Sequence, residues 1–434
     1  MRLQPYVPRL VIEWLRESPE RCYRQVEGSL AFVDVSGFTS LTERLSRRGK
    51  VGAEEMNQIL NECFTECLSS AYEFGAGVIK WGGDAVLLLF EGDRHERRAC
   101  RAAFEMQRTM RRVGRIRTDS GSVTLRMSIG VHSGSLDFFL VGDLHRELVV
   151  TGPAATRTVA IEAIADAGEI AISPQTAAAL DPRDLGREKD TAILLRRGPD
   201  VEGERGEAIE DAETLDLVSC IPVSVRGHLL AGATEPEHRL MTAAFIHVMG
   251  ADDRLARDGP DALSAALAAT LDAIEGTALD HGVSFFDTDI YLGGAKAMLM
   301  AGAPVSTGAD EERMLRAMRA VLDSDLPLPL RVGVTRGRIF VGDFGPAYRR
   351  TYTVTGDSVN LAARLMSRAE PGQILVENEV VERSRTRFEI AALEPFTVKG
   401  KNEPVRAHAL GRALGTTAGD TAQTPLVGRD RELA

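Results

Sequence analysis

The chain has 434 residues, of which 44% are hydrophobic and 26% are charged, and its formal net charge is −11 at pH 7. These values are typical of a globular protein with more than one core. They argue against a nucleic-acid polymer as partner, because an acidic surface repels phosphates and only 5% of the residues are aromatic. The five cysteines have no metal-binding or disulfide spacing, and no apolar run approaches the ~20 residues of a membrane helix. We therefore expect a cytoplasmic protein with no membrane segment.

Residues 1–28 contain a short amphipathic stretch. Apolar side chains recur at helical spacing at Val7, Leu10, Val11 and Trp14. The stretch lacks the apolar core of a signal peptide. We interpret residues 1–28 as a docking helix that precedes the first domain.

From residue 29 onward, the elements of the first half recur in the second half in the same order. Each half predicts a buried strand, a long helix, a hairpin at a Gly-Gly turn, a second helix and a long strand, and then a short strand, a helix and a last strand. This order predicts an α+β fold of two ferredoxin-like, palm-type domains, each with an antiparallel sheet and helices on one face. The matching segments are LAFVDVS and AAFIHVM, GVIKW and GVSFFDTD, DAVLLLF and AKAMLMAG, SIGVHSG and RVGVTRG, LVVTGPA and YTVTGDS, and GEIAIS and GQILVE.

The repeats set the expected domain boundaries. We assign residues 29–180 to the first domain and 241–412 to the second. Residues 181–240 are expected to form a linker, because their first part is rich in charged residues and glycine and has no sustained apolar period. Within this linker, IPVSVRGHLLAG predicts a short docking helix. Residues 413–434 are expected to be a second linker, which ends in LVGRDRELA and so resembles the entry to an ATPase module.

Two carboxylates follow the strands of the first half. Asp34 lies at the end of a buried strand before the turn at Gly37, and Asp84 follows the Gly-Gly turn of the hairpin. Central hairpin strands of this fold lie beside the first strand, so the two side chains can converge. Two carboxylates that meet phosphate oxygens are what a pair of Mg²⁺ ions requires. A strand-end cap and an ordinary turn aspartate are the alternative for each residue alone.

The second half carries a different polar pair, in the segment YTVTGDSVNLAARL. Asn360 and Arg364 are four residues apart, so they lie on one face of a helix that begins after a glycine. Such a pair can orient a ribose and neutralise the charge of a phosphoryl transition state. By itself, an Asn-x-x-x-Arg pair is more often a solvated helix face.

Together these segments resemble the class III adenylyl and guanylyl cyclases, and the tandem arrangement resembles that of the soluble adenylyl cyclases. The likeness covers about residues 29–175 and 241–410. It implies that the two domains pair about a pseudo-twofold axis, as an intramolecular heterodimer, and that ATP binds between them with two Mg²⁺ ions, which Mn²⁺ can replace. It also implies roles for single residues: metal binding by Asp34, Asp84 and the backbone of Val35; catalysis by Asn360 and Arg364; and nucleotide binding by Gly37, Phe38, Thr39, Thr353, Val354, Arg126 and Lys296.

Each half lacks the polar set of the other half. His247 and Ala295 stand where the second half would repeat the two aspartates, and Thr156 and Ala160 stand where the first half would repeat Asn360 and Arg364. One complete site is therefore expected, formed by both domains of a monomer. Its twin lacks the catalytic groups and is expected to be a pocket for a small effector.

Two departures from the family pattern bear on the activity. The lysine that reads the base is absent from its usual place, and Lys296 lies just past the turn. Ser128 stands where a basic phosphate-binding residue is expected, and Arg126 lies two residues away on the same strand face. We expect an adenylate cyclase, with Thr353 favouring adenine. A silent nucleotide-binding regulatory module, a guanylate cyclase or other palm-fold enzyme, and an interaction scaffold are the alternatives.

Overall fold

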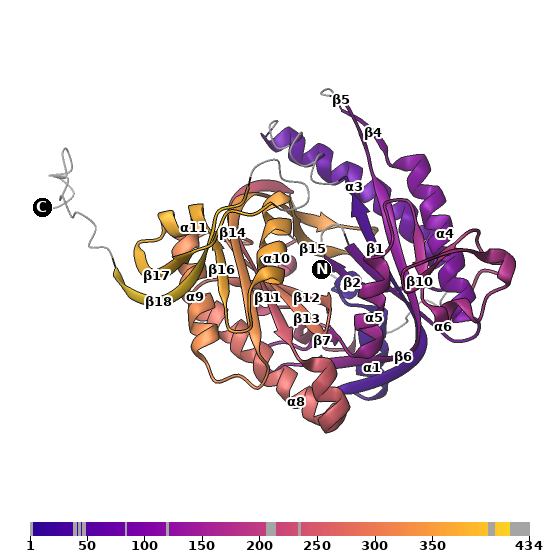
Figure 1. Ribbon diagram of the computed structural model, residues 1–434, viewed down its shortest axis with the longest axis horizontal. Coiled ribbons are helices and arrows are strands. Elements are labelled where there is room, and N and C mark those ends of the chain that lie inside the picture. Colours follow the sequence, from indigo (N-terminus) through magenta and orange to yellow (C-terminus); the bar gives the residue numbers. More distant parts are fainter. Residues whose placement is uncertain are drawn as a thin grey trace, which may run out of the picture.

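The structure is a computed structural model that describes residues 3–37, 41, 45, 49–82, 85–118, 121–204, 214–232, 236–397 and 404–416. Figure 1 shows two α+β lobes side by side, each with its own sheet and helices. The first lobe is drawn in indigo to magenta and the second in orange to yellow. The expected pair of similar domains is confirmed.

The sheet of the first domain has the strand order β2-β3-β1-β6-β8-β10-β9, and β7 pairs with β6. Alternate residues of β1 face opposite sides, as the period of a strand requires. Ala31 and Val33 pack with helices α3 and α4, whereas Leu30 and Phe32 face the second domain. The elements are β1 (Tyr23–Ser36), α3 (Gly49–Tyr72), β2 (Gly77–Gly82), β3 (Ala85–Glu91), α4 (His95–Val113), β4 (Arg115–Thr118), β5 (Gly121–Thr124), β6 (Arg126–Val141), β7 (Glu147–Val150), α5 (Pro153–Glu162), β8 (Ile170–Ile172), α6 (Pro174–Ala177), β9 (Leu185–Lys189) and β10 (Ala192–Leu195).

The sheet of the second domain repeats this topology, with the order β12-β13-β11-β14-β16-β18-β17 and with β15 paired to β14. In both sheets the long central strand pairs in parallel with a short strand that follows a helix. In the first sheet β6 pairs with β8, which follows α5, and in the second β14 pairs with β16, which follows α10. The elements are β11 (Glu237–Met249), α8 (Ala251–Asp280), β12 (Ser284–Tyr291), β13 (Gly294–Ala301), α9 (Asp310–Asp323), β14 (Leu330–Phe344), β15 (Thr351–Thr355), α10 (Asp357–Arg368), β16 (Ile374–Glu377), α11 (Asn378–Arg383), β17 (Thr386–Ala392) and β18 (Ala407–Thr416).

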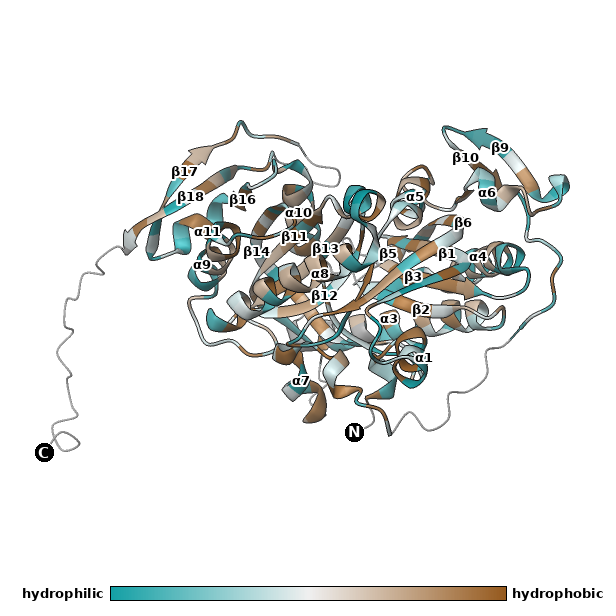
Figure 2. Ribbon diagram, turned by 90° about the horizontal axis from the view of Figure 1, so that it is seen from below, coloured by the Kyte–Doolittle hydropathy of each residue, from teal (hydrophilic) through white to brown (hydrophobic). Residues whose placement is uncertain are grey.

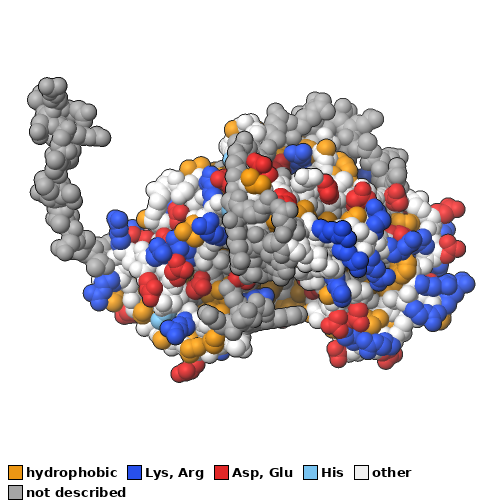
Figure 3. Space-filling model, turned by 90° about the horizontal axis from the view of Figure 1, so that it is seen from above, with side chains coloured by type: hydrophobic (Ala, Val, Ile, Leu, Met, Phe, Trp, Pro, Cys, Tyr) orange, Lys and Arg blue, Asp and Glu red, His pale blue; other side chains and the backbone are white. Residues whose placement is uncertain are grey.

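The two sheets share one apolar core across the domain interface. Leu30 and Phe32 of β1 belong to the same buried cluster as Phe245 of β11 and Met298 of β13. Such a core places the C-terminal end of β1 opposite α10. Apolar strand residues are visible as brown segments in Figure 2, while charged side chains of both signs cover the face drawn in Figure 3.

Two short segments outside the sheets bridge the domains. The N-terminal segment forms η1 (Gln4–Tyr6) and α1 (Arg9–Glu17), and the Tyr6 hydroxyl donates to Asp343 Oδ2 of the second domain at 2.7 Å. The helix expected in the linker is α7 (Val223–Leu230), where Ser224 Oγ donates to the carbonyl of Phe285 at 2.9 Å.

The segment expected as a linker is partly folded into the first domain. Strands β9 and β10 extend the first sheet, and β10 pairs antiparallel with β8. The interpretation of residues 181–195 as linker was wrong, because their few apolar residues pack against the core while the many charged ones lie on an exposed edge hairpin. Among the described helices, α8 alone is long and apolar enough to cross a membrane, and half of that stretch is buried inside the protein.

Candidate active site

A cavity of about 580 Å³ lies between the two domains, at the C-terminal end of β1. Its wall combines residues that are far apart in the sequence. This volume is in the range of small-molecule binding pockets. Of the residues expected from the sequence to form a site, it is lined by Asp34, Val35 and Gly37 from the first domain and by Lys296, Val354, Asn360 and Arg364 from the second.

The first-domain wall is set by the end of β1. Asp34 pairs with Ala85 of β3 and with Ser128 of β6, so its carboxylate leaves the sheet on the face toward the second domain. Gly37 then turns the chain at φ = +103°, and a Cβ there would lie 2.9 Å from the carbonyl oxygen of Thr124. Only glycine fits this turn without strain.

Three expected site residues lie outside the described part of the chain, namely Phe38, Thr39 and Asp84. Gly82 and Ala85, which flank Gly83 and Asp84 in the sequence, both line the cavity. Metal binding by Asp84 stays a prediction.

Helix α10 brings the polar pair of the second domain to the pocket. Asn360 and Arg364 both line the cavity, as their four-residue spacing predicts. Arg364 Nη1 is buried and has no hydrogen-bond partner among the described residues. A buried, unpaired guanidinium nitrogen is costly unless an anion pairs with it, so this wall suits a phosphate.

Lys296 lies in the pocket but is not free. Its Nζ is 3.0 Å from Asp289 Oδ2, its cross-strand neighbour on β12, and it lies 5.8 Å from the ring centroid of Phe245. The ion pair presents a donor and an acceptor side by side on the cavity wall.

Two other nucleotide-binding candidates do not line the cavity. Thr353 is 2% exposed, and its hydroxyl is buried without a partner among the described residues. Its neighbours Val354 and Thr355 line the pocket instead. Arg126 is an exposed residue at the start of β6, where it pairs with Ser36 at the rim. Nucleotide binding by Thr353 and Arg126 stays a prediction, since neither side chain is among the residues that line the cavity.

A row of polar residues on β12 was not predicted from the sequence. Asp287, Asp289 and Tyr291 alternate along this strand, and all three line the cavity. Their two-residue spacing places them on one face. That alternation in the segment FFDTDIY was visible in the sequence, but only the pairing of the domains shows that this face meets a pocket.

At the twin position, at the other end of the interface, Thr156 makes hydrogen bonds across the two domains. Thr156 Oγ1 donates to Asp252 Oδ2 at 2.6 Å and accepts from the N–H of Gly293 at 2.9 Å. The N–H of Gly152 donates to Asp252 Oδ1 at 3.1 Å. Burial raises the pKa of Asp252. Thr156 of the twin site therefore makes its hydrogen bonds across the two domains, and an effector pocket there stays a prediction.

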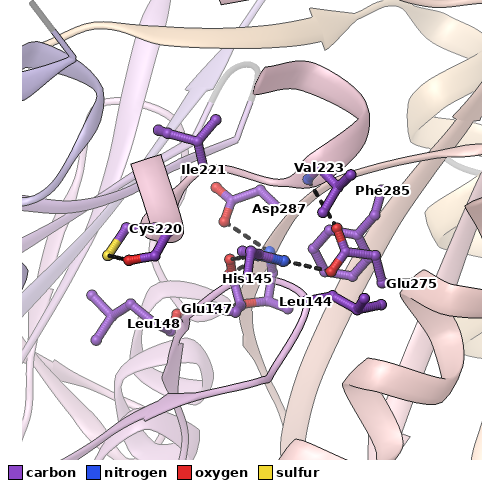
Figure 4. Close-up of polar contacts among 12 residues, drawn as sticks. Leu144, His145, Glu147, Leu148, Cys220, Ile221, Val223, Glu275, Phe285 and Asp287 are labelled. Atoms are coloured by element: carbon purple, nitrogen blue, oxygen red, sulfur yellow. Dashed lines mark hydrogen bonds and ion pairs between the residues drawn. The ribbon is translucent and has the colours of Figure 1, made fainter. Parts of the chain in front are cut away.

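A buried charged network lies between the two ends of the interface (Figure 4). Lys80 Nζ is 2.5 Å from Glu147 and 2.7 Å from Asp287, and His145 lies between Glu147 at 2.9 Å and Glu275 at 2.6 Å. Burial opposes the charge of His145, but the two carboxylates raise its pKa to about 9. Burial raises the pKa of Asp287 to about 7. The network joins residues of both domains and occupies Lys80 fully.

Comparisons with known proteins agree with this architecture. The family model of the adenylate and guanylate cyclase catalytic domain matches residues 22–209 and 312–411. Human adenylate cyclase type 10 is 24% identical over 415 residues, which cover 84% of this chain and 25% of that protein. An adenylate cyclase of Mycobacterium tuberculosis is 28% identical over 235 residues, which cover 50% of this chain and 51% of that protein. The chain thus spans about a quarter of the length of the type 10 relatives.

One solved structure resembles the whole tandem arrangement. A class III adenylyl cyclase-like ATP-binding protein from Pseudomonas aeruginosa is 12% identical and superposes with a TM-score of 0.59, covering 83% of this chain and 85% of that one. At this identity the likeness concerns the fold alone.

Proposed function

Because the chain belongs to the adenylate and guanylate cyclase family, we propose that it converts ATP into 3′,5′-cyclic AMP and pyrophosphate at the pocket of about 580 Å³ between its two domains. The observation that carries the proposal is the wall of that pocket. It combines the carboxylate of Asp34 from one domain with Asn360 and Arg364 from the other, and the Nη1 of Arg364 has no hydrogen-bond partner among the described residues. Either domain alone holds only one part of this set.

The residues present fit divalent metal ions. Asp34 offers a carboxylate at the pocket wall, Val35 offers a backbone carbonyl beside it, and Asp84 is predicted to supply a second carboxylate. Carboxylate and carbonyl oxygens are the ligands that Mg²⁺ and Mn²⁺ prefer. When bound, two such ions would neutralise phosphate charge and favour ionisation of the ribose 3′ hydroxyl.

The chain's own residues position the nucleotide for an intramolecular displacement. The 3′ oxygen forms a bond to the α-phosphorus, the bond to the pyrophosphate oxygen breaks, and the hydroxyl proton leaves. Asn360 holds the ribose in the orientation that this attack requires. Arg364 donates to the phosphate oxygens on which charge increases, an effect worth a few kcal/mol in comparable sites.

ATP is the proposed substrate because the curated relatives that match are adenylate cyclases. Within the pocket, the Lys296–Asp289 pair supplies a donor beside an acceptor, which complements N1 and the 6-amino group of adenine. The proposed preference for ATP rests on this pair and not on Thr353, whose hydroxyl is buried and which does not line the cavity.

A silent ATP-binding module is the second candidate. Two observations favour it: the solved structure with the same tandem fold is an ATP-binding, cyclase-like protein, and Ser128 replaces a basic residue next to the site. Such a module would bind ATP without forming a cyclic product.

The test is to assay the purified chain with ATP or GTP and Mg²⁺ or Mn²⁺, and to identify the product by mass spectrometry. We expect cyclic AMP from the intact chain, none from residues 1–204 or 205–434 alone, and concentration-dependent recovery when the two pieces are mixed. Binding of ATP without product would support the silent module. Product from the isolated second piece would contradict a shared pocket, because that piece contains neither Asp34 nor Asp84.

A further inference from the structure

Arg331 forms hydrogen bonds to the C-terminal end of α10, the helix that carries Asn360 and Arg364. It lies at the start of β14, and its Nη1 donates to the carbonyl oxygens of Ser367 at 3.0 Å and Ala369 at 3.2 Å. These are carbonyls at the C-terminal end of α10 (Asp357–Arg368), where the chain leaves the helix. Cations near this end also interact favourably with the helix dipole. Arg331 therefore acts as a C-terminal cap that comes from another element.

His247 holds Arg331 from the opposite side. The Nε of Arg331 donates to His247 Nδ1 at 3.0 Å, and the imidazole packs edge-on against Tyr291. Burial, together with the charge of Arg331, lowers the pKa of His247 to about 4. The neutral ring keeps Nδ1 as an acceptor, so the guanidinium is fixed between the imidazole and the helix end. This gives a function to the residue that replaces an aspartate in the second repeat.

The rest of β14 holds α10 along its length. Gly333 lets the helix approach closely, since a Cβ there would lie 2.2 Å from the carbonyl oxygen of Ala362. Thr335 Oγ1 donates to the carbonyl of Ser358 at 2.6 Å, near the start of the helix. Alternate residues of one strand thus fix the start, the middle and the end of the helix.

The first domain keeps the close approach of strand β6 to helix α5 but has a serine at the position of Arg331. Gly130 on β6 is the counterpart of Gly333, and a Cβ there would lie 2.4 Å from the backbone nitrogen of Glu162 on α5. Ser128, which pairs with Asp34 as Arg331 pairs with His247, has no guanidinium to offer. An arginine of the neighbouring strand therefore caps the helix that bears Asn360 and Arg364, whereas the matching strand position beside the helix that has Thr156 and Ala160 is a serine.

We propose that Arg331 is a positioning residue, which fixes the last turns of α10 so that Arg364 points into the pocket, and that His247 orients it. The inference rests on the proposed cyclase function. Arg364 lies one turn before the carbonyls that Arg331 holds, and Ser367 Oγ donates to the carbonyl of Arg364 at 2.8 Å. A helix end that shifts by about 1 Å misplaces a transition-state group enough to cost on the order of 100-fold in rate.

The first experiment compares Arg331→Gln with Arg383→Gln, which removes an exposed arginine of α11 whose side chain is 52% exposed. We expect Arg331→Gln to lower kcat by roughly 10- to 100-fold with KM for ATP changed less than about threefold, and to speed hydrogen exchange of the amides in the last turn of α10. The control should match the parent in both measurements. A kcat within twofold of the parent in folded Arg331→Gln would overturn the proposal.

A second set of variants separates positioning from simple stabilisation. Arg331→Lys keeps a donor for the carbonyls and should recover most of the rate, and His247→Asn should keep more of it than His247→Leu. The NMR titration of His247 should move to higher pH in Arg331→Gln, because one cause of its low pKa is gone. A rate loss that follows only the folded fraction, with Arg331→Lys as poor as Arg331→Gln, would contradict positioning. Absence of cyclic product in the parent would instead refute the cyclase function, and the exchange and titration results would then still test the hydrogen bonds of Arg331 to the helix end.

Discussion

The two ends of the domain interface have the same backbone topology but differ in their polar side chains. At one end, Asp34, Asn360 and Arg364 line an open cavity of about 580 Å³, and Arg364 Nη1 has no partner among the described residues. At the other end, Thr156 and Asp252 bond to each other across the interface. The difference shows that equivalent helix positions can present a buried donor to a cavity in one repeat and use it for domain pairing in the other.

The charged network between these ends reaches the open cavity through Asp287. Lys80 and Asp287 occupy matching places on β2 and β12, since each is the first paired residue after the register shift of its hairpin, opposite Leu87 and Met298 respectively. They pair with each other across the pseudo-twofold axis at 2.7 Å. An exchange of charge at one repeated position thus turned two like strands into complementary partners, which favours pairing within one chain.

The largest effect is expected from a substitution at the open end of the interface. Asp34→Asn removes a proposed metal-binding carboxylate and should lower cyclic AMP formation by at least about 100-fold, because loss of one charge-stabilising group costs decades in rate. The melting temperature should stay near that of the parent, since Asp34 is half-buried at a strand end. Product formation by mass spectrometry and thermal melting check this. Activity above about a tenth of the parent would refute the metal assignment.

The second prediction concerns the middle of the interface. Lys80→Met leaves the buried Glu147 and the partly buried Asp287 without their cation and should reduce the free energy of unfolding by about 3–5 kcal/mol. The matched control is Lys189→Met, whose ion pairs lie near the surface on β9 and should contribute far less to the free energy of unfolding. Urea unfolding measures both. Equal losses in the two variants would mean that the central network does not hold the domains together.

The third prediction is a pH dependence of the same network. The pKa of His145 is raised in the folded protein to about 9 from an unfolded value near 6.5, so its stabilising contribution is complete below pH ~6.5 and is lost as the pH rises through about 9. The free energy of unfolding should fall by roughly 2–3 kcal/mol over this range. His145→Gln should show a smaller slope in urea titrations at pH 6, 7.5 and 9. An identical slope would exclude His145 as its source.

The smallest expected effect concerns the Thr156 end of the interface. Thr156→Val removes the hydroxyl that links Asp252 with Gly293 and should cost about 1–2 kcal/mol of stability, while turnover stays within a few-fold. Thr156→Ser keeps the hydroxyl and serves as the control. A collapse of turnover at unchanged melting temperature would mean that the productive site lies at the Thr156 end of the interface and not at the Asp34 end.

The sequence alone was sufficient for the repeated α+β plan, for the helix of Asn360 and Arg364, and for the strand end at Asp34. These follow from local rules: apolar periodicity, glycine turns and the four-residue spacing of a helix face. The pattern of complementary losses between the halves also predicted that the site residues of the two domains belong together, and the cavity contains residues from both sets.

Only the tertiary structure decided which side chains fill the interface. Thr353 is buried, Lys296 pairs with Asp289, Thr156 bonds to Asp252 across the domains, and Arg331 reaches the end of α10. Each of these depends on a partner that is distant in the sequence or on the direction of one side chain in a strand. Neither periodicity nor composition encodes such long-range pairings, because they are fixed only when the two sheets pack and every buried polar group must find a partner.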